Sequence, residues 1–450
     1  MKITALGICP PPSAGENPAV TPELLASTFA RYSRSNRGID TILQSIDWNN
    51  PDASVDAIFR FVDYGHASIA GMTGGIPVII DGCSMFLAYK LFEIAQLCDG
   101  QESSTRYIKL DSSNLPDAQE IGIPGSLAGE WRSIMDFSFE CYNELYSALD
   151  DAARENPDII RYPAGANEKV IARLRKNYAL DRARYFIPFA TKTNAAFIMT
   201  ARVWADTLKQ LASLPLSEAQ QAAEAIRNEL SKFVPRLMRH SHPDAASLTQ
   251  ARLSIDSVLK SISAGGLPVH RCNDETFVAV DNSRPDFLPD TAPFSDAFAG
   301  KENRYSITGS TIRRSMVRVA WNNIALAELR DLNRHRSGYR FSPLAPAGFY
   351  LPEGISHPKT GELLERNRAF VNKLLQTDAA PAYVYALHLG TQVPFEHSTH
   401  LDKFIYEIEL RTGMGAHFRY AEHLNAVHRQ LCEKLPGIEP YITVGDAEPE

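Results

Sequence analysis

Apolar residues recur at helical spacing along several long stretches of the chain. Leu87, Leu91, Ile94 and Cys98 form one stripe within residues 83–98, and charged residues occupy the positions between them. This spacing of three and four positions predicts an amphipathic helix. The same period predicts further long helices over 196–211, 217–233 and 313–333.

Two of these stretches carry additional signals. The stripe of 313–333 runs through Val317, Trp321, Ala325, Leu329 and Leu332. The stretch 217–233 opens with Ser217, has Gln220 three positions later and stops before Pro235. A serine followed at that distance by a glutamine is typical of a capping box at a helix N-terminus.

Strand signals are fewer. The run TGGIPVIID at 73–81 has β-branched residues after paired glycines, which predicts a strand preceded by a turn. The run YITV at 441–444 gives a weaker signal of the same kind. Because helical periodicity dominates, the predicted fold class is α+β, rich in helix.

The texture of the sequence changes between residues 240 and 300, where Pro, Asp, Ser and Gly are frequent and periodicity is weak. Such composition is typical of connections between units. We therefore expect a first unit over 1–240, a connecting segment over 241–305 and a second unit over 306–450.

Composition and charge exclude several classes of protein. The 450 residues are 44% apolar and carry a net charge of −7, which argues against a general attraction to nucleic acid or to anionic membranes. The most apolar stretch contains Asp81 and Lys90, so it falls short of the roughly 18 apolar residues of a spanning helix. Neither a signal-peptide pattern nor a CxxC pair is present, which predicts a cytoplasmic protein with reduced cysteines.

Three short polar motifs are candidates for binding chemistry. RHR at 334–336 gathers cations at the end of a predicted helix, and arginine forks match phosphate oxygens. QESSTRY at 101–107 offers a carboxylate, hydroxyls and an arginine, and GHAS at 65–68 offers a histidine. Taken singly, RHR and GHAS are explained more simply as a solvated helix end and a capped or core histidine. A satisfied polar loop explains QESSTRY at least as well as a ligand site.

Taken together, the motifs resemble those of the flavin-dependent thymidylate synthase family, which methylates C5 of dUMP. That family carries GHxS, a helix ending in RHRxxSxNExSxRY, then ARxxLP, NxR, and LR followed five residues later by AQ. The first half of this chain has GHAS, ESSTRY, ARYFIP at 183–188 and TAR at 200–202; the second half has RHR, IELR at 408–411 and AHFR at 416–419.

The resemblance implies two tandem units like those of the family, each helix-rich with a small β-sheet. It also implies that the family's motifs are divided between two halves of a duplicated and fused chain. In the first half Ile94-Ala95-Gln96 stand where RHR is expected, and no arginine stands near 211–214. The second half keeps RHR and Arg411, but the loop after RHR looks several residues short, with Arg340-Phe341 in place of RY. Because the losses are complementary, we expect one composite site built from both halves.

The resemblance also implies a role for each matching residue. Those expected to bind the nucleotide are Glu102, Ser104, Arg106, Arg184 and Arg334. Those expected to bind flavin are His66, Ser68, Gln101, Arg202, His335 and Arg336. Arg411 is the expected catalytic residue, because it would stabilise negative charge that develops on the uracil ring.

The implied activity is FAD-dependent methylation of a uracil nucleotide of the dUMP type, with methylenetetrahydrofolate as carbon donor and NADPH as reductant. This chemistry needs no cysteine nucleophile, in agreement with cysteines that lie in no recognisable nucleophile setting. The implied assembly is a homodimer that imitates the family's tetramer. Its partner is a small-molecule nucleotide, with neither nucleic acid nor a membrane.

Three alternatives remain. Thr200 and His417 depart from the family pattern, so the substrate could be a different pyrimidine nucleotide or a related compound. A non-catalytic nucleotide- and flavin-binding regulator would lose Arg411 or the flavin contacts, which this sequence keeps. HSTH at 397–400 would place two imidazoles on one face of a helix, as in a metal hydrolase, but neither HExxH nor a carboxylate pair accompanies it. We therefore expect no metal.

Overall fold

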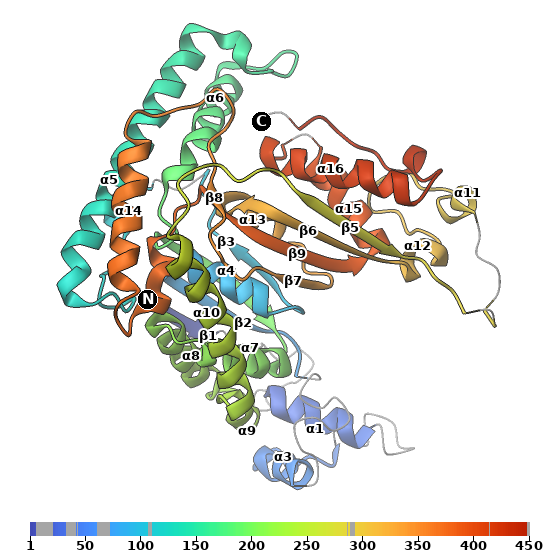
Figure 1. Ribbon diagram of the computed structural model, residues 1–450. Helices are drawn as coiled ribbons and strands as arrows, with labels where there is room; N and C mark the ends of the chain where they lie inside the picture. The colour runs from blue at the N-terminus through green and yellow to red at the C-terminus, as the bar shows by residue number, and fades with distance from the viewer. Residues whose placement is uncertain are drawn as a thin grey trace. The chain divides into compact units, whose positions relative to one another are not determined.

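The computed structural model describes residues 1–5, 21–32, 42, 44–60, 73–106, 110–285, 287–288, 293–413 and 415–447. The chain divides into two compact units. Unit 1 comprises Met1–Ser104, Glu120–Gly122 and Lys192–Ser254; unit 2 comprises Thr105–Gln119, Ile123–Thr191 and Ile255–Glu450. Each unit contains one small antiparallel sheet with helices, which confirms the predicted α+β class (Figure 1).

The sheet of unit 1 has four antiparallel strands in the order β1-β2-β4-β3. They are β1 (Lys2–Ala5), β2 (Ile76–Ser84), β3 (Asp99–Glu102) and β4 (Lys192–Met199). Ile76, Val78 and Ile80 of β2 are buried, and the residues between them are less so. Since successive side chains of a strand point to opposite faces, one face of β2 packs into the core.

The helices of unit 1 are α1 (Pro22–Tyr32), α3 (Pro51–Phe59), α4 (Met85–Ile94), α7 (Ala201–Ser213), α8 (Ser217–Leu230), α9 (Pro235–Met238) and the 3-10 helix η6 (Arg239–Ser241). Ser84 caps α4, and its N and Oγ donate to Glu218 of α8 at 2.8 and 2.6 Å. Trp204 of α7 donates its indole N–H to Ile76 O at 2.9 Å. These bonds tie the helices to both ends of β2.

The sheet of unit 2 repeats this arrangement. Its antiparallel strands follow the order β5-β6-β9-β7, and β8 also pairs with β9. The strands are β5 (Thr276–Asp281), β6 (Met316–Ala325), β7 (Tyr339–Phe341), β8 (Gly348–Phe349) and β9 (Thr391–His400). Trp321 of β6 stacks on Phe395 of β9 with ring centroids 5.9 Å apart, which anchors the buried face.

The longest helix of unit 2 is α5 (Gly125–Glu155), which packs against α6 (Glu168–Ala183) and α14 (Thr360–Leu374) (Figure 1). The short helices are η3 (Ser112–Asn114), η4 (Pro157–Ile159), η5 (Arg184–Phe186), α11 (Phe294–Ala297), α12 (Ser310–Arg314), α13 (Leu326–Leu332), η7 (Ala380–Ala386) and η8 (Glu439–Tyr441). The others are α15 (Leu401–Arg411) and α16 (Phe418–Lys434), while α10 (Ala245–Gly265) begins in unit 1 and ends in unit 2.

The two sheets also share the order of elements along the chain. The second strand runs directly into a helix in both (β2 into α4, β6 into α13), and the last strand leads into another (β4 into α7, β9 into α15). Both second strands have a register shift near their carboxyl ends. We call β1 through α8 repeat 1 and β5 through α16 repeat 2. The repeats differ from the units, because α5, α6 and η5 of repeat 1 belong to unit 2.

Within unit 2 the segments that precede β4 and β9 pair with each other. Phe189 N donates to Leu387 O, and Leu389 N donates to Ile187 O, both at 2.8 Å. The bridge between Pro188 and His388 lies between these bonds. This reciprocal exchange is what a local two-fold axis through equivalent positions produces. Parts of repeat 1 and repeat 2 therefore form one compact unit.

The predicted helices over 196–211 and 313–333 are wrong in their first parts. Residues Met316–Ala325 form β6, and residues Lys192–Met199 form β4; helices begin only at Leu326 and Ala201. In the stretch 313–333, the stripe positions Val317, Trp321 and Ala325 are four residues apart, and four is compatible with a helical period as well as with the two-residue period of a strand. The pairing of β6 and β4 with neighbouring strands decides between the two.

The other predicted elements agree more closely. Helix α4 lies within 83–98, α8 within 217–233, and β2 overlaps 73–81 after the predicted turn. The capping box is wrong, because Leu216 is the N-cap and Gln220 donates to Leu214 O instead. The weak strand at 441–444 is also wrong, since η8 ends at Tyr441 and no strand follows it in the part of the chain that the structure describes.

The segment 241–305 is not an irregular connection. Helix α10 occupies Ala245–Gly265, and β5 is a full member of the second sheet, so repeat 2 begins inside this segment. Val258 and Ile262 are the buried residues of α10. A helix with so narrow a buried stripe gives a weak periodic signal, which explains the wrong prediction.

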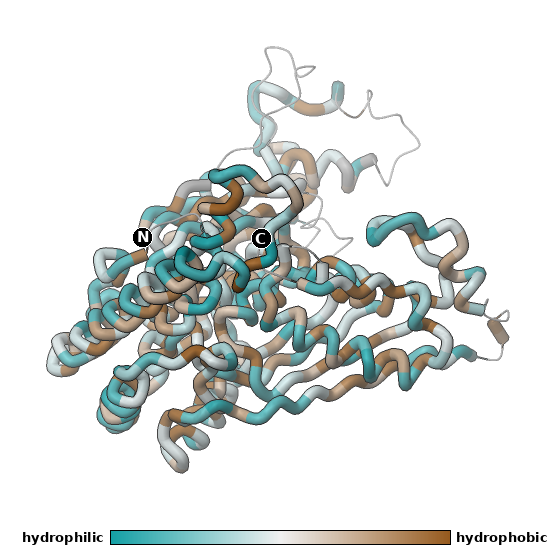
Figure 2. Tube along the Cα trace, turned by 90° about the horizontal axis from the view of Figure 1, so that it is seen from above, coloured by the Kyte–Doolittle hydropathy of each residue, from teal (hydrophilic) through white to brown (hydrophobic). Residues whose placement is uncertain are grey.

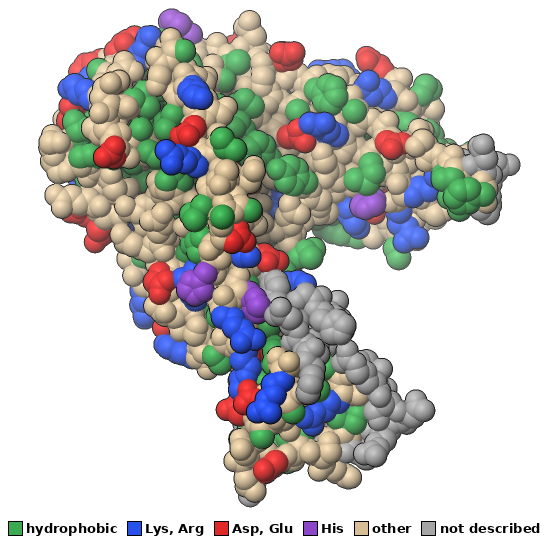
Figure 3. Space-filling view, turned by 60° about the horizontal axis from the view of Figure 1, so that its bottom comes forward, with side chains coloured by type: hydrophobic (Ala, Val, Ile, Leu, Met, Phe, Trp, Pro, Cys, Tyr) green, Lys and Arg blue, Asp and Glu red, His purple; other side chains and the backbone are tan. Residues whose placement is uncertain are grey.

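Three observations concern the apolar helices, the surface charge and the cysteines. No helix in the described ranges is long and apolar enough to cross a membrane, and hydrophobic and hydrophilic segments alternate along the trace in Figure 2. Charged side chains of both signs are interspersed on the face shown in Figure 3. The five cysteines that the structure describes are free thiols.

Candidate functional site

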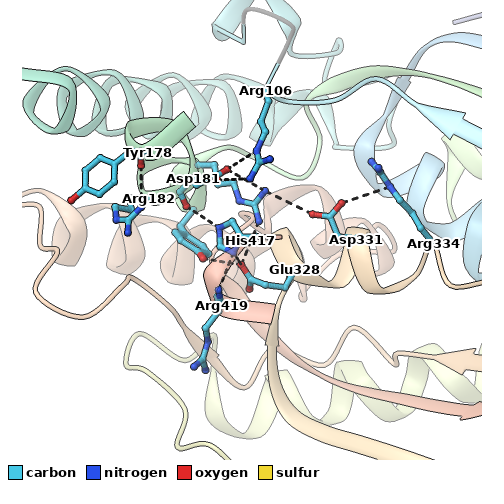
Figure 4. Close-up of polar contacts among 11 residues, drawn as sticks. Arg106, Tyr178, Asp181, Arg182, Glu328, Asp331, Arg334, His417 and Arg419 are labelled. Carbon is cyan, nitrogen blue, oxygen red and sulfur yellow. Dashed lines mark hydrogen bonds and ion pairs between the residues drawn. The ribbon is translucent and has the colours of Figure 1, made fainter. Parts of the chain in front are cut away.

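A cluster of buried charged residues lies in unit 2, where the end of α6, the short helix η5, helix α13 and the start of α16 meet (Figure 4). Its centre is Arg184, the first residue of η5, which is only 5% exposed. Figure 4 shows side chains from both repeats pointing toward one another at this place. The cluster is therefore a feature of the paired repeats rather than of one of them.

Arg184 has more hydrogen-bonding capacity than its neighbours use. Its guanidinium lies 3.6 Å from Glu328 Oε1 and 4.0 Å from both Asp181 Oδ1 and Asp331 Oδ2. Nε and Nη2 are buried, and among the described residues neither has a hydrogen-bond acceptor. Because buried donors are normally satisfied, these two N–H groups are suited to an anionic ligand.

Asp181, on the last turn of α6, joins the cluster to the ESSTRY motif. Arg106 donates to both of its carboxylate oxygens, from Nε at 3.3 Å and from Nη2 at 2.6 Å. His417 Nε2 donates to the main-chain carbonyl of Asp181 at 3.2 Å. The side chain of Asp181 is 1% exposed, so it holds Arg106 next to Arg184 inside the unit.

Glu328 is a buried acid on α13 that was not predicted. Tyr185 donates its hydroxyl to Glu328 Oε1 at 2.8 Å, and His417 Nδ1 lies 3.9 Å away. Burial raises the pKa of Glu328 to about 7, although Arg184 lowers it. The charge beside Arg184 therefore changes close to neutral pH.

Asp331 lies one turn further along α13 and behaves in the opposite way. Burial alone would raise its pKa, but Arg334, Arg184 and Arg411 together hold the pKa well below the ordinary value. Its nearest cation is Arg334, whose Nε lies 3.7 Å from Oδ1 and whose side chain is 31% exposed. Asp331 is thus a permanent anion that links Arg184 to the RHR motif.

His335 and Arg336, the second and third residues of the RHR motif, have different surroundings. Arg411, the last residue of α15, donates from Nε to His335 Nε2 at 2.7 Å and from Nη2 to Asp331 O at 3.2 Å. His335 is 9% exposed, and burial lowers its pKa to about 3. It is therefore neutral and faces Arg411, whereas Arg336 remains partly exposed.

The structure thus brings together five of the predicted site residues in unit 2: Arg106, Arg184, Arg334, His335 and Arg411. Arg336 directly follows His335 in the loop between α13 and β7. Gln101, Glu102, Ser104 and Arg202 belong to unit 1. Glu102 is the buried last residue of β3, and Arg202 lies in the first turn of α7. His66 and Ser68 lie outside the described residues.

The family departures at 200 and 417 both fall on helix N-caps. Thr200 caps α7, and His417 caps α16 by accepting from Arg419 N at 3.1 Å. His417 is 2% exposed, and burial followed by Arg184 lowers its pKa well below the ordinary value. Its polar atoms are therefore engaged within the protein.

The predicted shortening of the loop after RHR is wrong. Residues 333–338 separate α13 from β7, and only 95–98 separate α4 from β3. Asp99 of β3 and Tyr339 of β7 each pair with the residue three positions before the following helix. Arg340 is therefore equivalent to Gly100 and does not stand in for Arg106. It is buried and donates to Asn333 O instead.

HSTH at 397–400 is not on a helix. It ends strand β9, where His397 is fully buried and His400 is exposed, so the two imidazoles point to opposite faces. In the residues that the structure describes, no group of three or more metal-ligating side chains is found. The geometry of this motif gives no support to a paired metal site.

Sequence reasoning missed Asp181, Glu328 and Asp331. A signal for two of them was present, because Asp181 stands three positions before Arg184, and Asp331 stands three before Arg334. Residues three apart on a helix or its end are neighbours in space. Glu328 gave no such signal, since its partners Tyr185 and Arg184 come from the other repeat.

The first half of the chain matches the model of a known family. Residues 19–236 match the model of the family described as thymidylate synthase complementing protein. This match confirms the resemblance seen in the motifs of the first half.

Three individual proteins are also similar to the chain. The UPF0159 protein Ta1429 from Thermoplasma acidophilum is 23% identical over 486 positions, covering 93% of this chain and 95% of that protein. The flavin-dependent thymidylate synthase ThyX from Helicobacter pylori, solved with FAD and dUMP, is 19% identical, covering 49% of this chain and 96% of its own, with a TM-score of 0.29. The UMP/dUMP methylase PolB from Streptomyces cacaoi, solved with 5-Br dUMP, is 18% identical, covering 53% and 94%, with a TM-score of 0.31.

Proposed function

We propose that this protein is an FAD-dependent enzyme that methylates C5 of a uracil nucleotide of the dUMP type, at a composite site to which both repeats contribute. The observation that carries the proposal is Arg184, whose Nε and Nη2 have no hydrogen-bond acceptor among the described residues and lie buried beside Arg106 of repeat 1 and Glu328 of repeat 2. The family assignment of residues 19–236 supplies the reaction class.

Gene duplication and fusion explain why the site is divided. The two repeats share strand order, element order and reciprocal main-chain bonds. Four positions before the Pro188–His388 bridge, repeat 1 has Arg184 and repeat 2 has Val384. A second site of this kind lacks its central cation, so we propose one working site for each chain.

The nucleotide phosphate is the group that fits Arg184. An arginine fork binds phosphate oxygens in pairs, and the uncharged form of Glu328 removes a competing anion. Arg106 and Arg334 lie on either side and would add further positive charge. Glu102 and Ser104 are proposed to contact the rest of the nucleotide.

The residues proposed to hold FAD are only partly suited to direct contact. Arg336 and Arg202 are partly exposed and Gln101 is exposed, so these three side chains are accessible to a ligand. His335 does not fit a direct contact, because its ring nitrogens face Arg411 and Glu407. When bound, FAD would supply the redox and one-carbon transfer chemistry, while the protein orients the substrates. His66 and Ser68 complete the proposed set.

Arg411 is proposed to act on the uracil ring. A guanidinium held by two bonds inside the protein needs no reorganisation when negative charge develops nearby, which is the condition for electrostatic stabilisation. The overall reaction replaces the C5 hydrogen with a methyl group whose carbon comes from methylenetetrahydrofolate and whose reducing equivalents come from NADPH.

The test is incubation of the protein with FAD, NADPH, methylenetetrahydrofolate and dUMP, followed by mass analysis of the nucleotide. A product heavier by one methylene unit is expected. Methylation of another pyrimidine nucleotide but not of dUMP would favour the alternative substrate. Binding of flavin and nucleotide without any product would favour a regulatory protein. The proposed homodimer is checked by the mass of the particle in solution.

A further inference from the structure

Two buried titratable residues in unit 2 have no part in the function proposed so far. Glu407 on α15 is 1% exposed, and His397 on β9 is fully buried. Glu407 Oε2 lies 3.1 Å from His397 Nδ1 and 3.9 Å from His335 Nδ1. The carboxylate is therefore placed between two imidazoles, one of which contacts Arg411.

The hydrogen-bond partners determine which ring nitrogens carry protons. His335 Nε2 accepts from Arg411 Nε at 2.7 Å, so its proton must lie on Nδ1, which faces Glu407. His397 Nε2 lies 2.9 Å from Ser337 O and must donate to it, since a carbonyl oxygen only accepts. His397 Nδ1 therefore holds the Glu407 carboxylate only when this second ring nitrogen also carries a proton. Burial alone would raise the pKa of Glu407, but His335, His397 and Arg411 lower it, so the group is an anion.

Arg411 and His397, together with Arg340, also hold the RHR loop in place. The carbonyl oxygens that follow a helix end have no partner within the helix. Here Asp331 O accepts from Arg411, Asn333 O accepts from Arg340, and Ser337 O accepts from His397. The loop that carries Arg334, His335 and Arg336 is thus held at three places from α15, β7 and β9.

Repeat 1 has none of these groups at the equivalent positions. Counted from the first residue of α7 and of α15, Thr207 replaces Glu407 and Leu211 replaces Arg411. In the last strands, Phe197 replaces His397. The carboxylate, the histidine and the arginine therefore occur together in repeat 2 and are missing together from repeat 1.

We propose that Glu407 and His397 are positioning residues that orient the guanidinium of Arg411 through His335, and so set the direction in which Arg411 donates to the substrate. This inference rests on the proposed function only for its catalytic consequence. The arrangement itself is a property of the protein without substrate.

Glu407→Gln keeps the size of the side chain and removes its charge. We expect kcat for nucleotide methylation to fall between about tenfold and a hundredfold, because small misplacements of a reacting group have effects of this size. The nucleotide KM is expected to stay within about threefold. In an Arg411→Lys background, Glu407→Gln should have little further effect, since both act through the same group.

Glu409→Gln is the matched control. Glu409 lies on the same helix, is 4% exposed and binds Lys301 and Thr443 N instead of the histidines. It is expected to lower stability as Glu407→Gln does, but to leave kcat unchanged. His397→Gln provides a second test in case Glu407→Gln does not fold.

A readout independent of activity is the Arg411 Nε–H resonance of the full-length protein labelled with 15N-arginine. The expected result is a solvent-protected signal in the wild type and in Glu409→Gln that is lost in Glu407→Gln and His397→Gln. A signal and a kcat that survive both substitutions would overturn the inference. If the wild type methylates no nucleotide, the proposed function fails, and the resonance still decides the positioning role.

Discussion

Repeat 1 and repeat 2 each build a sheet with the same strand order, yet they contribute different residues to one charged cluster. At the eleventh position of the helix after the last strand, repeat 1 has the fully buried Leu211 and repeat 2 has Arg411. Four positions before the bridge that joins the repeats, the arginine is instead in repeat 1, as Arg184, and repeat 2 has Val384.

The difference shows that one backbone can accommodate an apolar core or a buried charge at the same position. An apolar side chain contributes about 1.5–3 kcal/mol by burial alone. A buried charge requires partners, and Arg184 finds them in Asp181, Glu328 and Asp331. Paired repeats can therefore lose one set of charges and keep the fold, as long as the remaining set is complete.

The largest expected effect comes from Arg184→Met. The change leaves the buried carboxylates of Asp181 and Glu328, and the partly exposed one of Asp331, without their shared cation. The free energy of unfolding should therefore fall by about 3–5 kcal/mol in urea denaturation. Nucleotide binding measured by calorimetry should also be lost. Arg182→Met is the control, because Arg182 lies over the Tyr178 ring rather than among the carboxylates, and its loss should change little. Equal stability of the two variants would contradict the central role of Arg184.

Arg411→Leu places the residue of repeat 1 into repeat 2. The chain should still fold, but kcat should fall by about 10²–10³, which is typical of removing one donor to a developing charge. Leu211→Met tests the equivalent position of repeat 1 and should keep kcat. The comparison fails if both substitutions reduce kcat to the same extent.

A smaller effect is expected from Glu328→Gln, and its sign depends on pH. The folded pKa is about 7 and the ordinary value is 4.5, so the folded protein holds the proton more tightly. The wild type therefore loses stability as pH rises from 4.5 to about 7, by about 3 kcal/mol. The variant lacks this loss, so its stability relative to the wild type should increase over that range. Thermal unfolding at pH 5 and pH 8 measures it, and a pH-independent difference would be the contrary result.

The smallest effect concerns repeat 1 alone. Glu218→Gln weakens the bonds to Ser84 at the junction of β2 and α4, and we expect a loss of about 1–3 kcal/mol in stability with kcat unchanged. Glu224→Gln on the same helix, where the carboxylate is 59% exposed, should change stability by less than about 1 kcal/mol. A reduced kcat with normal stability would place a working site near this junction.

Much of the site could be predicted from local motifs. RHR, ESSTRY, ARYFIP and IELR pointed to Arg106, Arg184, Arg334, His335 and Arg411, which lie in one unit. The role of His335 could not be predicted, because it depends on Glu407 and on Arg411, which lie far along the chain. Arg340 was misplaced for a similar reason, since only the pairing of β7 with β9 shows which residue it matches.

The sequence by itself determined the α+β class, the composition of the motifs and their division between two halves, because these depend on residue types and on short spacings. Only the tertiary structure decided that 316–325 and 192–199 are strands, since both pair with neighbouring strands that lie far away in the sequence. The four-residue spacing within 317–325 fits a helix as well as a strand. The tertiary structure also decided which charges are buried together. Arg184 and Glu328 come from different repeats, and their contact depends on main-chain bonds that no local pattern records.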